Sequence, residues 1–240
     1  REAHFPAGSM YERDLDRTAA NFRPLTPLTF LDRAADTFPE RIAVRHGALA
    51  RTYAELRARC HALAAGLAAR GVGPGDTVAV MAPNIPALLE AHYGVPLAGA
   101  VLNALNTRLD AHTIAYILAH GEAKLLLTDT EFAPVIKDAL TQLDRDIEVV
   151  DIVDDPEAGE RLGARDYEAL LAAGAEDFVP YHPSDEWQAI SLNYTSGTTG
   201  DPKGVVYHHR GAYLNAVGNA LVWDLGDRPV YLWTLPMFHC

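Results

Sequence analysis

The chain has 240 residues, 49% of them hydrophobic and 22% charged, which is ordinary for a globular protein able to form one large domain or two subdomains. Its formal net charge of −12 argues against nucleic acid or an anionic membrane surface as the main partner. The two cysteines, Cys60 and Cys240, lack metal-ligand spacing, so we expect no disulfide scaffold and a cytoplasmic location. No apolar run of about 18 residues exists, so we expect no membrane span.

The first half of the chain predicts helices and short strands in alternation. Thr52 and Glu55 have the spacing of a capping box, which marks the start of a helix, and Gly71 suits its end. Apolar positions at helical spacing follow Thr52, whereas residues 77–81 form a continuous apolar run typical of a buried strand. The expected elements are helices at 29–38, 53–70, 85–98 and 111–120, a hairpin within 42–51, and strands at 77–81, 100–103 and 124–128.

The second half continues the alternation. The expected elements are helices at 131–143, 167–173 and 211–223, and strands at 147–153, 189–194, 204–208 and 230–235. We expect Trp223 and Trp233 to be packing anchors. The acidic residues Asp151, Asp154, Asp155 and Glu157 are expected on a solvated face. Together the elements predict a layered α/β fold.

The segment between the expected strands at 189–194 and 204–208 has the composition most informative about ligand binding. It reads Y-T-S-G-T-T-G-D-P-K-G and holds three glycines, four aliphatic hydroxyls and one lysine. Glycine lets the backbone approach an anion closely, hydroxyls donate to phosphate oxygens or ligate Mg²⁺, and lysine adds a mobile charge. Lys203 is followed by Gly204 and not by a hydroxyl residue, so the common G-x-x-x-x-G-K-[ST] pattern is excluded. The composition favours a polyphosphate-binding loop over an ordinary polar surface loop.

This segment resembles, nearly residue for residue, the glycine-rich signature of the adenylate-forming (AMP-binding) superfamily. That superfamily includes acyl-CoA synthetases, peptide-synthetase adenylation domains and beetle luciferases. The sequence L-P-M-F-H-C at 235–240 is similar to the P-M-F-H segment of acyl- and acetyl-CoA synthetases, and V-V-Y-H-H-R-G at 205–211 fits the same branch. Together they look like medium-chain fatty-acyl-CoA synthetases and methylmercaptopropionate-CoA ligases.

The resemblance implies a specific architecture: layered α/β subdomains of the acyl-CoA synthetase amino-terminal domain, incomplete. Residues 1–26 would be an N-terminal extension and residues 27–240 the first part of the AMP-binding large domain. The carboxy-terminal part of that domain and the small domain would be absent, so the fragment alone is expected to be inactive. A homodimer is possible by analogy with related enzymes.

The resemblance also implies an ATP-dependent acyl-CoA ligase acting on a short- or medium-chain fatty or modified carboxylic acid. The carboxylate and ATP give an acyl-adenylate and pyrophosphate, and coenzyme A then forms a thioester and releases AMP. Mg²⁺ would accompany ATP, with Thr195 near the metal. Lys203 and His239 are the implied catalytic residues. The implied nucleotide-binding residues are Thr195, Ser196, Gly197, Thr198, Thr199, Gly200 and Lys203, and the implied substrate-binding residues are Met237, Phe238 and His239.

Several alternatives stay open from the residues. Lys203 could be a plain exposed lysine, His239 a core histidine, and Met237 with Phe238 ordinary core. Asn106 and Arg108 could form a surface site or a subdomain contact. As neighbours on a strand, His208 and His209 are expected to point to opposite faces and not to share a metal. The whole protein could instead load a carrier protein, or the chain could be a non-catalytic nucleotide-binding fragment.

Overall fold

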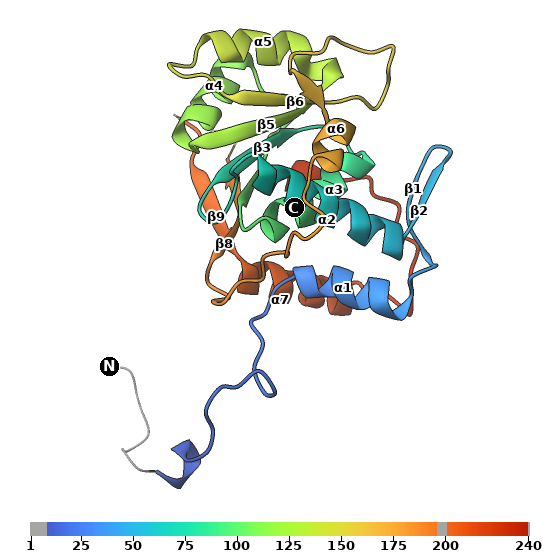
Figure 1. The fold of residues 1–240 in the computed structure, drawn as a ribbon, viewed down its shortest axis with the longest axis vertical. Helices are drawn as coiled ribbons and strands as arrows, with labels where there is room; N and C mark the ends of the chain where they lie inside the picture. Colours follow the sequence, from blue (N-terminus) through green and yellow to red (C-terminus); the bar gives the residue numbers. More distant parts are fainter. Residues whose placement is uncertain (1–8, 196–200, 240) are drawn as a thin grey trace.

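A twisted sheet with helices on both faces forms the body of the protein (Figure 1). The computed structural model describes residues 9–195 and 201–239. The seven strands lie in the order β7-β6-β5-β3-β4-β8-β9, parallel except for the antiparallel pair β8–β9. The strands are β3 (Thr77–Met81), β4 (Val101–Ala104), β5 (Ala123–Asp129), β6 (Glu148–Ile152), β7 (Arg165–Asp166), β8 (Ala189–Tyr194) and β9 (Gly204–His208). The predicted α/β class is confirmed.

The helices are divided between the two faces of the sheet. They are α1 (Leu28–Thr37), α2 (Tyr53–Ala69), α3 (Pro86–Leu97), α4 (Ala111–His120), α5 (Ala133–Thr141), α6 (Tyr167–Ala172) and α7 (His209–Val222). Alternate residues of β3 point to opposite faces. Accordingly, Val78 and Val80 pack with α2, α3 and α6, whereas Ala79 and Met81 pack with α4 and α5. Both faces of β3 are therefore buried, which explains its continuous apolar sequence.

Local signals fix several helix starts. The Thr52 hydroxyl accepts a hydrogen bond from the Glu55 backbone N–H (3.2 Å), and the Glu55 carboxylate accepts one from the Thr52 N–H (2.7 Å). This is the predicted capping box at the start of α2. Asp110 caps α4 with a single hydrogen bond, which its carboxylate accepts from the Thr113 N–H (2.8 Å). The predicted hairpin forms as β1 (Ile42–His46) and β2 (Leu49–Thr52).

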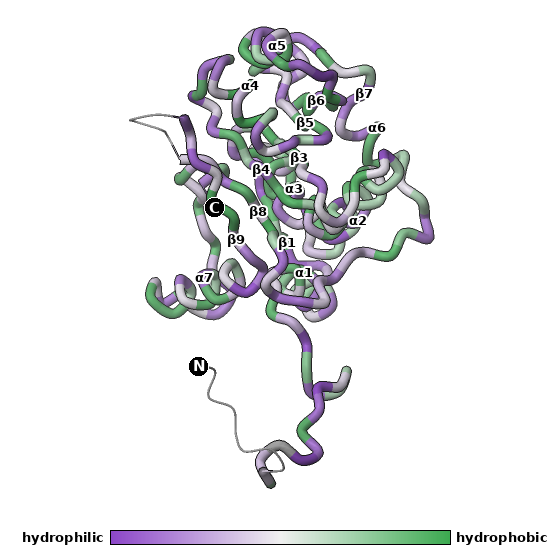
Figure 2. The backbone as a smooth tube through the Cα atoms, turned by 90° about the vertical axis from the view of Figure 1, so that its left-hand side faces the viewer, coloured by the Kyte–Doolittle hydropathy of each residue, from purple (hydrophilic) through white to green (hydrophobic). Residues whose placement is uncertain are grey.

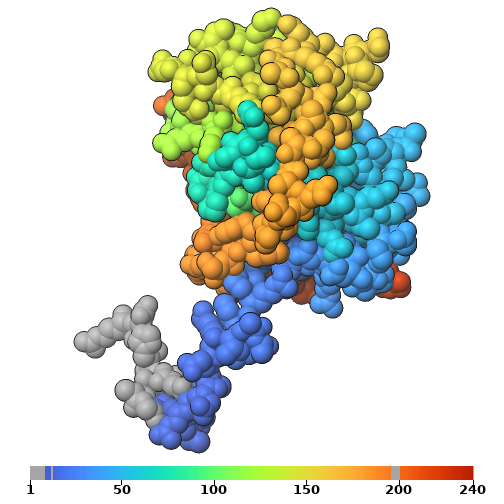
Figure 3. All heavy atoms as spheres, in the orientation of Figure 1, coloured from blue at the N-terminus to red at the C-terminus, as the bar shows by residue number. Residues whose placement is uncertain are grey.

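The segment before α1 runs away from the body. Figure 3 shows it as an arm below the domain, and the turned view in Figure 2 shows the same arm leaving beside α1. Its inner end is fastened to the body at two points. The Leu25 N–H donates to Glu186 (2.8 Å), which lies before β8 and pairs with Arg210 of α7, and Thr26 is hydrogen-bonded to His209 at the start of α7 (2.8 Å). Thr26 is buried, so the body of the fold begins near this residue.

The predicted strand at residues 230–235 is wrong. Within the described residues these positions pair with no strand, and Val230 is 96% exposed and Leu232 81%. An apolar run becomes a strand only where a neighbouring backbone supplies a hydrogen-bonding ladder. The expected packing anchors Trp223 and Trp233 are also exposed, and each contacts the Tyr231 ring instead of entering a core.

Two further expectations need correction. Asp151 is fully buried on β6, where its carboxylate accepts hydrogen bonds from the Leu162 N–H (3.0 Å) and the Gly163 N–H (2.9 Å). These bonds satisfy a buried carboxylate, so Asp151 fixes a loop and does not lie on a solvated face. Asp154, Asp155 and Glu157 are exposed as expected. Helix α7 starts at His209 and not at Gly211, because His208 caps it.

Candidate active site

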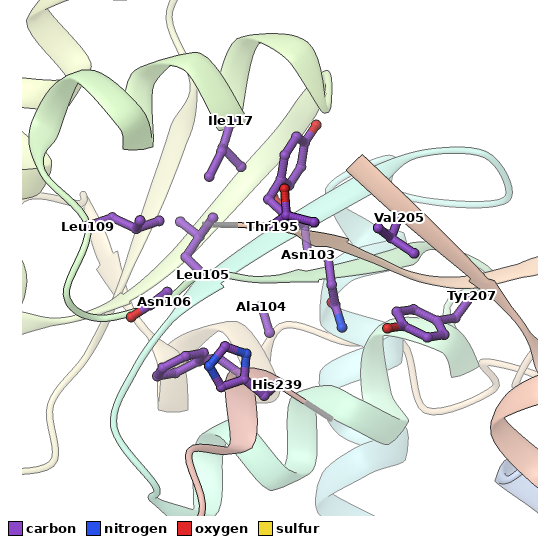
Figure 4. A pocket seen from close by; sticks show the side chains of 13 residues that line it. Asn103, Ala104, Leu105, Asn106, Leu109, Ile117, Thr195, Val205, Tyr207 and His239 are labelled. Atoms are coloured by element: carbon purple, nitrogen blue, oxygen red, sulfur yellow. The ribbon is translucent and has the colours of Figure 1, made fainter. Parts of the chain in front are cut away.

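A cavity of about 320 Å³ opens where β4 and β8 end (Figure 4). The carboxyl edge of parallel strands is the usual ligand-binding edge of an α/β sheet. Side chains from β4, β8, β9, α4 and the turn at 237–239 surround the cavity. Its lining residues are Asn103, Ala104, Leu105, Asn106, Leu109, Ile117, Asn193, Tyr194, Thr195, Val205, Tyr207, Phe238 and His239.

The two ends of the glycine-rich segment are joined at the rim of this cavity. The antiparallel pairing of β8 and β9 ends at Tyr194 and Gly204. Beyond it, the Thr195 N–H donates to the Lys203 carbonyl (3.1 Å), and the Lys203 N–H donates to the Thr195 hydroxyl (3.2 Å). Thr195 lines the cavity, so the structure places this candidate residue in the site.

Five predicted nucleotide-binding residues, Ser196, Gly197, Thr198, Thr199 and Gly200, lie outside the described residues. Lys203 is exposed just beyond them and is not part of the cavity lining. Its ammonium group has no ion pair with any residue that the structure describes. A lysine without a carboxylate partner is available to pair with an anionic ligand.

Tyr194 anchors the start of the segment, a role that the sequence analysis missed. Its hydroxyl is hydrogen-bonded to His120 Nδ1 (2.7 Å), and the two rings meet edge to face. Tyr116 stacks on the His120 ring. Burial raises the pKa of Tyr194 above its ordinary value. Only the position of Tyr194 directly before the glycine-rich run could have drawn attention to it.

The turn at Met237–His239 forms the opposite wall of the cavity. Phe238 lies against the His239 ring, with 4.5 Å between ring centroids, and both side chains line the cavity. Figure 4 shows His239 and Thr195 reaching toward the space from two sides. Met237 is buried in the core and is not among the lining residues, so its role in substrate binding stays a prediction.

Two asparagines of the β4 end complete the polar lining. Asn103 is fully buried, and its amide donates to the Leu192 carbonyl (2.8 Å), while its side-chain oxygen has no hydrogen-bond partner in the part of the chain that the structure describes. Asn106 accepts a hydrogen bond from the Arg108 N–H (2.9 Å). Asn106 lines the cavity, whereas Arg108 does not. Sequence reasoning gave no signal for Asn103.

The adjacent histidines have structural partners. The His208 ring accepts a hydrogen bond from the Gly211 N–H (2.8 Å) and caps α7. His209 is buried beside Thr26, and this burial lowers the pKa of its imidazole to about 4. Across residues 9–195 and 201–239, no group of three or more His, Cys, Asp or Glu side chains could hold a metal ion.

The described residues suit a nucleotide whose phosphates bind the metal ion. Mg²⁺ keeps several waters and is commonly bound by substrate phosphates with one or two protein oxygens. The Thr195 hydroxyl offers one such oxygen at the cavity, and Lys203 offers an exposed ammonium group that forms no ion pair with the described residues. This donor set fits a Mg²⁺–ATP complex better than a metal held by protein alone.

Comparison with known proteins decides the family. The family model described as "AMP-binding enzyme" matches residues 31–240. The chain belongs to the AMP-binding enzyme family. The family resemblance predicted from the sequence is thereby confirmed.

Several proteins that this chain resembles are named as CoA ligases. The chain is 48% identical to the acetate/butyrate–CoA ligase AAE7, peroxisomal, of Arabidopsis thaliana, covering 95% of this chain and 42% of that protein. It is 43% identical to the trans-cinnamate:CoA ligase, peroxisomal, of Petunia hybrida, covering 94% and 42%. The chain thus spans less than half the length of these relatives. Both names place the relatives in peroxisomes, so our cytoplasmic location stays a prediction.

Solved structures confirm the expected fold. The o-succinylbenzoate CoA synthetase of Bacillus subtilis, in complex with its acyl-adenylate intermediate, matches with a TM-score of 0.72 and 29% identity, over 89% of this chain and 50% of that one. A long-chain-fatty-acid-CoA ligase of Archaeoglobus fulgidus matches in fold with a TM-score of 0.76 and 22% identity, over 91% and 43%. The described part of the chain contains no helix long and apolar enough to cross a bilayer.

Proposed function

We propose that this chain is the amino-terminal part of an ATP-dependent acyl-CoA ligase. The observation that carries the proposal is the meeting of two segments at one cavity: Thr195, at the start of the glycine-rich segment, and His239, at the end of the 237–239 turn. Residues 27–240 would form the first part of the large AMP-binding domain, after an extension at 1–26. The 48% identity to an acetate/butyrate–CoA ligase supports the same reaction class.

In the first step, the substrate carboxylate attacks the α-phosphate of ATP, and pyrophosphate leaves with the electron pair of the broken P–O bond. This step needs positioning and charge stabilisation more than a protein nucleophile. Lys203 would balance the charge of the leaving pyrophosphate, and the amides and hydroxyls of the glycine-rich segment would hold its oxygens. Bound Mg²⁺ would neutralise phosphate charge, with the Thr195 hydroxyl as a nearby protein oxygen.

His239 and Phe238 would act on the acid. His239 is exposed to the cavity, where its imidazole can donate a hydrogen bond to the carboxylate or to the α-phosphate. Phe238 supplies an apolar wall for the acyl group, and Met237 would support that wall from the core. In the second step, the thiol of coenzyme A attacks the acyl carbon, a thioester forms and AMP leaves.

We propose a short- or medium-chain fatty or modified carboxylic acid as the substrate. The names of related ligases include acetate, butyrate, benzoate and 2-methylpropanoate, all small acids. The cavity is walled by Leu105, Leu109, Ile117 and Phe238, apolar groups that suit a short hydrocarbon chain.

The test uses the whole protein with ATP and Mg²⁺. Each acid of a series, from acetate to octanoate with benzoate and cinnamate, is assayed for exchange of labelled pyrophosphate into ATP. The adenylate step predicts exchange that depends on the acid. Coenzyme A and a phosphopantetheinyl carrier protein are then compared as acceptors. Absence of acid-dependent exchange across the series contradicts the proposal, and thioester formed on the carrier alone contradicts the CoA-ligase assignment.

A further inference from the structure

Asn84 is joined twice to the backbone just before His239. Its side-chain amide donates to the Leu235 carbonyl (2.7 Å), and its side-chain oxygen accepts from the Met237 N–H (2.9 Å). The pairing spans more than 150 positions of the sequence. A carboxamide presents one donor and one acceptor side by side, so it can pair with a chain segment as a neighbouring strand would.

The segment at residues 223–235 has few hydrogen bonds to the body after its first three residues, within the part of the chain that the structure describes. It forms no strand among the described residues, and its apolar side chains are largely exposed. Its start continues from α7, where the Trp223 N–H donates to the Asn219 carbonyl (2.9 Å) and the Leu225 N–H to the Ala220 carbonyl (3.0 Å). Farther along, the Arg41 side chain donates to the Arg228 carbonyl (3.0 Å). The two hydrogen bonds to Asn84 therefore fix the backbone at Leu235 and Met237, where the segment reaches the cavity.

Asn84 is itself held rigidly. It lies between β3 and α3, with Pro83 and Pro86 on either side, and each proline restricts the backbone. Its neighbours Ala82 and Ile85 are buried in the core. The carboxamide is thus presented from a fixed point, which limits the entropy lost when it binds the segment.

The register of the following turn decides which side chains face the cavity. Met237 and Phe238 are each 8% exposed and pack in the same core as α3, whereas His239 is exposed to the cavity. Burial of two apolar side chains draws the turn inward, but apolar contacts are not directional. Hydrogen bonds are directional, so the pair at Leu235 and Met237 selects one register.

We infer that Asn84 is a positioning residue, which sets the register of residues 235–239 and so places His239 and Phe238 at the cavity. Its catalytic consequence rests on the proposed function. Asn84→Ala removes both hydrogen bonds. Asn84→Asp keeps an acceptor for the Met237 N–H but sets a carboxylate against the Leu235 carbonyl. Both variants loosen the turn without altering a side chain that lines the cavity.

The test compares four variants of the whole protein. Asn84→Ala and Asn84→Asp are the test pair. Asn215→Ala changes an exposed asparagine on α7, and Ala91→Gly weakens α3 without touching the hydrogen bonds of Asn84. Hydrogen exchange of the Met237 amide, measured by mass spectrometry, reports the register contact directly. Rates of pyrophosphate exchange are measured while the concentration of the best acid or of ATP is varied. They give kcat, KM for the acid and KM for ATP.

The Asn84 variants are expected to exchange the Met237 amide at least about tenfold faster, because its acceptor is lost or displaced. Their kcat/KM for the acid should fall by about tenfold or more, while KM for ATP stays within about twofold. Neither effect is expected in Asn215→Ala or Ala91→Gly. Unchanged protection of Met237 overturns the register contact, and faster exchange with unaltered acid kinetics overturns the positioning role. If the wild-type protein shows no acid-dependent exchange, the proposed function fails, and the amide measurement still decides the contact.

Discussion

The Lys203 backbone N–H donates a hydrogen bond to the Thr195 hydroxyl (3.2 Å), across eight positions of the chain. With the Thr195 N–H bonded to the Lys203 carbonyl (3.1 Å), it joins both ends of the glycine-rich segment. The backbone of Lys203 is thereby fixed, whereas its ammonium group is free of carboxylates within the described residues. A lysine whose backbone is fixed and whose ammonium group has no carboxylate partner among the described residues is suited to a polyanionic ligand.

The Lys203→Ala variant of the whole protein should lose about 10²-fold or more of acid-dependent pyrophosphate exchange, because a cation that stabilises transition-state charge is removed. The side chain is exposed, so the thermal unfolding midpoint should stay close to that of the wild type. Lys137→Ala, which removes an exposed lysine paired with Glu160, is the control. Equal exchange rates in the two variants would exclude Lys203 from the chemistry.

Thr195→Val removes the hydroxyl that accepts from the Lys203 N–H, and Thr195→Ser keeps it. We expect the valine variant to need more Mg²⁺ for half-maximal exchange and to bind ATP several-fold more weakly, since a hydrogen bond is worth about 1 kcal/mol. The serine variant should resemble the wild type. The measurement is a Mg²⁺ titration of pyrophosphate exchange. A valine variant with an unaltered titration contradicts any role of this hydroxyl near the metal.

Tyr194→Phe removes the hydroxyl that is hydrogen-bonded to His120 Nδ1 (2.7 Å) and leaves the ring contact. The free energy of unfolding should fall by about 1 kcal/mol. In a double-mutant cycle with His120→Ala, the two losses should not add, because both variants break the same bond. Chemical unfolding of the four proteins gives the coupling. Strict additivity would show that the bond contributes nothing.

His209 should make folding stability depend on pH. Its folded-state pKa of about 4 is below the ordinary value of 6.5, so protonation favours the unfolded chain. The stability is therefore fully present above pH 6.5 and is lost as the pH falls toward 4, by at most about 3 kcal/mol. The free energy of unfolding, measured with urea at several pH values between 7.5 and 5, should change less with pH in His209→Gln than in the wild type. An identical pH dependence in the two proteins would contradict the burial of a neutral imidazole.

The buried carboxylate of Glu90 binds three partners from other elements. It accepts hydrogen bonds from Arg51, from Arg59 Nε (2.7 Å) and from the Tyr167 hydroxyl (2.8 Å). Glu90→Ala should cost about 3–5 kcal/mol, because it leaves buried charges without a counter-charge. Glu168→Ala, which removes the exposed partner of Arg59, should cost less than about 1 kcal/mol. Similar melting midpoints for both variants would argue against the buried network.

The sequence predicted elements well where the signal is local. Thr52 and Glu55 lie three positions apart, and their reciprocal bonds form within one turn of helix. The run at 230–235 has the composition of a strand, yet strand formation depends on a neighbour far away in sequence. The same limit applies to Asp151, because composition cannot show which distant amides will satisfy a buried carboxylate.

The site was predicted in part. Thr195 and His239 were found through motifs and meet at one cavity. Asn84, Asn103 and His120 contribute through contacts with residues distant in sequence, which no local pattern reports. Their polar side chains are common in loops and at helix ends, so each is unremarkable until the fold brings its partner beside it.

The most direct test of the central claim is a crystal structure of the whole protein with Mg²⁺ and a non-hydrolysable ATP analogue. We predict that the β- and γ-phosphates lie against the glycine-rich segment between Thr195 and Lys203, with the α-phosphate facing the cavity that His239 lines. A nucleotide bound at another part of the molecule, with this cavity empty, would contradict the account.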